Sequence, residues 1–154
     1  MLPIAATEPQ GEPTRLDAFR GHLARDLLER LSACDEDSEL GEALDRWELA
    51  LFAGEASRSE QLREALAALL GGQDGLWAAS ARLAVLVGQT PSERGELFAR
   101  IRSEEPDSDL VRRALVEVLM SGDRLRLVDK LDESLVGLSA RPVGYYSAQA
   151  AAAS

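Results

Sequence analysis

The feature that most constrains this chain is a helical period that is interrupted again and again by capping residues, glycine or proline. Apolar residues recur every three or four positions in seven stretches, which is the spacing of one face of an α-helix. The first of these stretches runs through Leu16, Phe19, Leu23, Leu27 and Leu31. No stretch alternates strictly between apolar and polar residues in the manner of a half-buried strand. We therefore predict an all-α fold of about seven helices, more than about 60% helical and without a sheet.

Capping residues place the ends of these helices. Thr90-Pro91-Ser92-Glu93 combines a cap, a proline at the first helical position and a glutamate at the third. Gly54 can end a helix in the left-handed conformation, and Gly88 and Gly122 close two others. The predicted helices are 15–33, 38–53, 58–70, 75–87, 91 to just before Pro106, 108–121 and 124–138. We expect one domain over residues 14–139, an N-terminal tail over 1–13 and a C-terminal tail over 140–154.

The helix expected at 75–87 differs from the others in its charge. Only Arg82 is charged within it, and apolar residues occupy nearly all of its sides. A helix of this kind is buried on most sides. We therefore expect Trp77 to be largely buried, in which case Trp77→Ala would cost about 3–5 kcal/mol.

Three segments share a spacing that is typical of helical hairpins. Asp37, Asp74 and Asp107 each stand three positions before a large apolar residue, and each begins a helix that ends at a glycine. A more polar helix follows each glycine. The aspartates lie 37 and 33 positions apart, within the range of helical-hairpin repeats.

Residues 104–135 carry the most specific version of this pattern. They contain Val111-Arg112-Arg113-Ala114-Leu115, then Leu119, then Gly122-Asp123. The segment resembles a HEAT-type repeat of the short class, and the resemblance implies an α-solenoid of stacked antiparallel hairpins. Tetratricopeptide repeats have a similar period, and Phe98 and Pro106 fall at matching places. A compact helical bundle is the third arrangement, and the sequence leaves all three open.

The charge of the chain bears on its partners. Asp and Glu number 27 against 17 Lys and Arg, which gives a formal net charge of −10. Binding to nucleic acid depends largely on basic groups that displace counterions from phosphates, so we expect neither nucleic acid nor an anionic membrane surface as a partner. No stretch approaches the roughly 20 apolar residues of a membrane span, and the N-terminus lacks the basic region of a signal peptide. We expect a cytoplasmic protein, although export by a leaderless route would look the same.

Few residues offer catalytic chemistry. His22 is the only histidine and Cys34 the only cysteine, and together they supply neither an activated nucleophile nor a zinc site. A calcium loop starting at Asp35 would have Leu40 and Arg46 where glycine and glutamate are needed. Acidic neighbours should raise the pKa of Cys34. We therefore predict a protein that is not an enzyme, with no catalytic, cofactor-binding or metal-binding residues.

The helix at 38–53 carries the candidate binding site. Its acidic residues are spaced by three and share a side, while further apolar residues exceed what one buried stripe requires. The predicted partner-binding residues are Glu39, Glu42, Asp45, Trp47, Leu49 and Phe52. If the helix at 15–33 covers Leu49 and Phe52, binding should be electrostatic and weakened by salt; if it does not, the two form an open apolar patch.

These observations favour a non-enzymatic protein-interaction module, such as an adaptor, a chaperone or a regulator. Its partner would be another protein, either one with a basic surface or, in a homo-oligomer, a second copy. One alternative is an acidic inhibitor that blocks a basic surface or mimics nucleic acid. Another is a chaperone or secreted regulator of a bacterial secretion system.

Overall fold

A computed structural model of the chain describes residues 17–103 and 106–152, apart from the side chains of Phe19, Ala33 and residues 149–152. Over this part of the chain the predicted all-α class is confirmed, because 82% of the structure is helical and none of it forms a strand. The predicted N-terminal tail, 1–13, lies outside the described residues. The predicted C-terminal tail, 140–154, includes a short helix.

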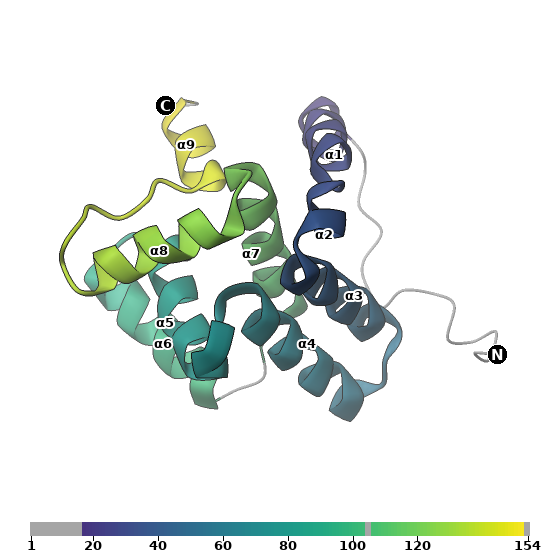
Figure 1. The fold of residues 1–154 in the computed structure, drawn as a ribbon, viewed down its shortest axis with the longest axis horizontal. Coiled ribbons are helices and arrows are strands. Elements are labelled where there is room, and N and C mark those ends of the chain that lie inside the picture. The colour runs from purple at the N-terminus through teal and green to yellow at the C-terminus, as the bar shows by residue number, and fades with distance from the viewer. Residues whose placement is uncertain (1–16, 104–105, 153–154) are drawn as a thin grey trace.

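The seven predicted helices are present, with ends shifted by a few residues (Figure 1). They are α1 Ala18–Arg30, α3 Ser38–Phe52, α4 Glu55–Leu70, α5 Gly75–Val87, α6 Pro91–Ser103, α7 Ser108–Ser121 and α8 Arg124–Leu135. Three short elements were not predicted: α2 Ala33–Glu36, the 3₁₀ turn η2 Gly72–Asp74 and α9 Tyr145–Ala152. Helix α8 ends before the expected 138, since Gly137 turns the chain at φ +77°.

Capping explains most of the helix starts. The side chains of Asp37, Asp107 and Asp123 each accept a hydrogen bond from a backbone N–H of the helix that follows. Gly122 has φ +76° and ends α7 as predicted. The prediction for Gly54 was wrong: its φ is −66°, and it stands in extended conformation immediately before α4. Helix α4 starts at Glu55, earlier than the predicted start at residue 58.

The helices form a compact bundle more than a linear stack of hairpins. Helices α3 and α4 pack closely as a hairpin, and α5 packs on α4 and α6. Helix α7 then returns to contact α1, α3 and α4, while α8 leaves α7 and crosses α5 (Figure 1). The segment that most resembles a repeat, 104–135, thus places its two helices against different neighbours.

The core lies between α4, α5 and α7. Leu66, Leu69, Leu83 and Val118 have almost no exposed surface, and every residue of α5 from Ala78 to Val87 is buried. Trp77 corrects the sequence prediction, because its side chain is 59% exposed. It stands in the first turn of α5, where its ring packs in an edge-to-face arrangement with Phe98 on α6, with the ring centroids 6.1 Å apart.

Candidate functional site

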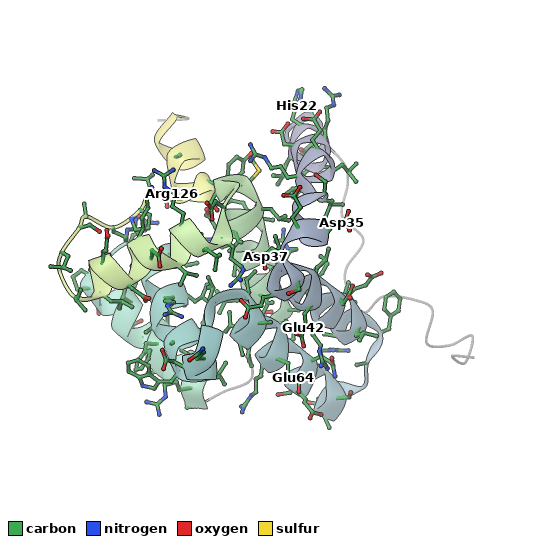
Figure 2. All side chains as sticks on the ribbon, viewed as in Figure 1. His22, Asp35, Asp37, Glu42, Glu64 and Arg126 are labelled. Carbon is green, nitrogen blue, oxygen red and sulfur yellow. The ribbon has the colours of Figure 1, made fainter. Side chains whose placement is uncertain are left out.

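Two of the three predicted acidic residues on α3 are engaged in ion pairs within the molecule. Arg124, at the start of α8, donates to the carboxylate of Glu39. Arg46 lies 3.4 Å from Glu42 on its own helix and 2.5 Å from Glu64 on α4, and Figure 2 labels both glutamates. Asp45 is exposed and forms no ion pair with any described residue. Of the acidic residues predicted to bind a partner, Asp45 is thus the one without an ion pair among the described residues. Its neighbour Glu48 is also exposed.

The three predicted apolar residues of α3 differ in their exposure to solvent. Trp47 points inward: it packs against the core, and its indole N–H donates to the carbonyl oxygen of Ser108 over 3.2 Å. Leu49 is 54% exposed, and Phe52 is half-buried. Helix α1 packs against α7, so Leu49 remains open to solvent. We use the name α3 surface for Asp45, Glu48, Leu49 and Phe52.

Two buried arginines hold the C-terminal end of α4. Arg82 donates through Nη1 to the carbonyl oxygens of Leu70 and Gly71, at 2.6 and 3.0 Å, and pairs with both carboxylate oxygens of Asp132 at 2.7 and 2.8 Å. Arg124 reaches the carbonyl of Leu69 at 3.5 Å. The last carbonyls of a helix have no partner within it and carry partial negative charge. Both arginines thus stabilise the fold. No local sequence pattern predicted this role.

Arg124 also sets the ionisation of Asp37. Burial alone would raise the pKa of this carboxyl group, but the Arg124 guanidinium, 2.7 Å away, and the backbone N–H groups of Leu40 and Glu39 outweigh it and hold the pKa below its usual value. Asp37 is thus both the cap of α3 and the partner of a buried cation.

Helix α9 is held by a buried glutamate that sequence analysis did not single out. Glu117, in the middle of α7, is only 4% exposed, and its carboxylate accepts hydrogen bonds from the backbone N–H groups of Tyr145 and Tyr146. A Cβ atom on Gly144 would stand 2.7 Å from that carboxylate, so any larger residue before the helix would require the Glu117 side chain to shift. The only available signal was one acid within the apolar run "LVEVLM".

The residues weighed for catalysis lie apart. His22 is exposed near the outer end of α1 (Figure 2). The pKa of the half-buried Cys34 is raised, first by burial and then by Asp35, Asp37 and Asp45, which confirms the predicted direction. Among the described residues, no three His, Cys, Asp or Glu side chains are grouped to hold a metal. No described helix has the length and apolar character needed to cross a membrane.

Comparisons with known proteins leave the chain without an assigned family. No family model matches it, and no curated protein or solved structure matches it significantly. The likeness of residues 104–135 to a HEAT-type repeat therefore stays a resemblance.

Proposed function

We propose that this protein is a non-enzymatic interaction module, such as an adaptor, chaperone or regulator, that binds another protein through the α3 surface. One observation carries the proposal: Leu49 is 54% exposed on a helix whose opposite side, at Leu40, Ala43 and Ala50, is locked in the core. The backbone that presents Leu49 is therefore rigid, and a rigid apolar anchor loses little entropy on binding.

The charges beside Leu49 indicate the chemistry of the partner. Asp45 and Glu48 stand next to it with no ion pair among the described residues. Protein interfaces commonly combine an apolar centre with a polar rim, and complementary rim charges speed association. We infer a partner that offers an apolar recess for Leu49 and basic side chains around it.

The ion pairs of α3 argue against nucleic-acid mimicry. Such mimicry would need carboxylates spread over one face at the spacing of phosphates. Arg124 and Arg46 instead engage Glu39 and Glu42. Glu39 is for the same reason a poor choice for mutagenesis, because changing it would leave a buried cation without one of its partners.

The test compares Leu49→Ser with a matched control, Leu138→Ser, at a position that is 79% exposed. Each full-length chain, tagged at the N-terminus so that α9 stays undisturbed, is used to capture proteins from native lysate for quantitative mass spectrometry. We expect a stoichiometric partner that the wild type and the control retain and that Leu49→Ser loses by about tenfold or more.

A second variant, Asp45→Lys, tests the role of charge on the recovered complex. It should lower the association rate and reduce the dependence of that rate on salt. If Leu49→Ser and Asp45→Lys are folded and hold every partner as the wild type does, the α3 surface is not the binding site.

A further inference from the structure

A groove of about 480 Å³ lies between α6 and α7. Val87, Leu97 and Leu110 supply the apolar part of its lining. Arg100, in the last turns of α6, and Arg113, on α7, line it from the two helices. This volume falls in the range of sites for small ligands, which are commonly apolar with a few well-placed polar groups. None of these residues belongs to the α3 surface.

The two arginines of the groove lack anionic partners. Neither forms an ion pair or a hydrogen bond with any described residue. The guanidinium of Arg113 lies over the ring of Tyr146, 5.3 Å from its centroid, and its Nε is buried without an acceptor. Stacking occupies the face of a guanidinium and leaves its in-plane N–H groups available.

The two carboxylates in the groove already have donors. Glu93 accepts the backbone N–H groups of Gln89 and Thr90 at 2.7 and 3.2 Å, and Glu96 accepts the hydroxyl of Ser92 at 3.0 Å. Both stand near the start of α6, where the helix dipole favours negative charge. The charged groups of the groove that lack a partner are therefore the cations Arg100 and Arg113, toward the other end of α6. The ligand that would complement them is an anion.

We propose that the groove binds a carboxylate carried on a short apolar body. Arg100 and Arg113 donate charge-assisted hydrogen bonds to the carboxylate, while Val87, Leu97 and Leu110 cover the apolar part. Two sources share this chemistry: a free organic acid, and the C-terminal carboxylate of a peptide that ends in an apolar residue. Either would accept hydrogen bonds from the terminal N–H groups of Arg100 and Arg113, which have no acceptor among the described residues.

Four probes test the proposal on the full-length protein by amide chemical shifts in NMR: hexanoate, hexylamine, and the peptide acetyl-Ala-Ala-Leu with a free or an amidated C-terminus. We expect hexanoate and the free-acid peptide to shift the amides of Val87, Leu97 and Leu110, and the amine and the amide to leave them unchanged. Tighter binding of hexanoate would assign the site to free acids, and tighter binding of the peptide to chain termini. No shift with either acid, or equal shifts with hexylamine, would overturn the proposal.

Three substitutions locate the anion. Arg100→Gln and Arg113→Gln should each weaken binding of the tighter acid by about tenfold, whereas Glu96→Gln should strengthen it several-fold because a like charge leaves the groove. The control is Arg102→Gln, which removes a cation that stacks on Phe98 outside the groove, 5.5 Å from the ring centroid. Because Arg113→Gln also removes the contact with Tyr146, Arg100→Gln is the decisive variant. Equal weakening by Arg100→Gln and Arg102→Gln in folded proteins would show only a loss of net charge.

Discussion

Arginines occupy two regions of this molecule in opposite states. At the end of α4, Arg82 and Arg124 are buried, and they donate to carbonyl oxygens and carboxylates. In the groove between α6 and α7, Arg100 and Arg113 have no acceptor among the described residues. The same side chain therefore serves the fold where it donates to the last carbonyls of a helix, and is available to a ligand where it makes no such contact.

Arginines that donate to the carbonyl oxygens at the end of a helix are common in this structure. Arg30 donates to the carbonyls of Leu119 and Met120 at the end of α7. Arg58 does the same at the end of α3, and Arg141 at the end of α5. Lys130 is the only lysine among the 17 basic residues. A planar guanidinium reaches several acceptors at once, which a single ammonium group does less well, and this helps explain the bias.

The largest effect is expected at Arg82. Arg82→Ala would leave the carbonyls of Leu70 and Gly71 buried and Asp132 without its partner, so we expect the free energy of unfolding to fall by about 3 kcal/mol. Urea denaturation followed by circular dichroism measures the change. The control is Arg126→Ala, an exposed position on α8, which should change stability by less than about 0.5 kcal/mol. Equal losses of stability for the two variants would contradict the proposed difference between buried and exposed arginines.

A smaller loss of stability, which depends on pH, is expected when Asp37 is substituted. Its pKa is lower in the folded protein than its usual value, so the ionised carboxylate stabilises the fold above that usual value, and this stabilisation is lost as the pH falls through the folded-state pKa. Asp37→Asn keeps a capping side chain but removes the charge, and should cost about 1 kcal/mol at pH 7. Its melting temperature should also depend less on pH than that of the wild type between about pH 5 and pH 2. Parallel curves for the two proteins would show that the pair with Arg124 contributes nothing.

The smallest effect is expected at Arg100. Because it has no partner among the described residues, Arg100→Ala should leave the melting temperature and the free energy of unfolding within about 0.5 kcal/mol of the wild type. Urea denaturation beside Arg82→Ala makes the comparison direct. A loss comparable to that of Arg82→Ala would place Arg100 with the arginines that serve the fold.

Sequence periodicity was enough to predict the seven main helices, because each buries a stripe of regular spacing. It was not enough to predict their packing. Asp132 and Asp37, the carboxylates that pair with Arg82 and Arg124, lie 50 and 87 positions away along the chain, and no local pattern connects residues at such distances. Helix α9 has no apolar period of its own, and Glu117 determines where it begins.

The candidate site shows the same limit. Leu49 was predicted from the excess of apolar residues on α3, and its exposure is consistent with that reasoning. Glu39 was included as a free charge, since nothing near it in sequence reveals Arg124. Trp77 was expected to be buried because its helix is apolar on all sides, but that argument ignores position along the helix: burial begins one residue later, at Ala78.

The long reach of the Arg82 and Arg124 contacts also determines when the chain can fold. A chain that leaves the ribosome N-terminus first presents the hairpin of α3 and α4 early, but the carbonyls at the end of α4 stay without their arginine partners until Arg82 and Arg124 have followed. Asp132, the acid that holds Arg82, emerges later still. Contacts that span 50 and 87 residues slow the search for the native state relative to a bundle held together by sequence neighbours. We therefore expect this domain to fold as one late, cooperative event near the end of its synthesis, with its first half dependent on its last quarter.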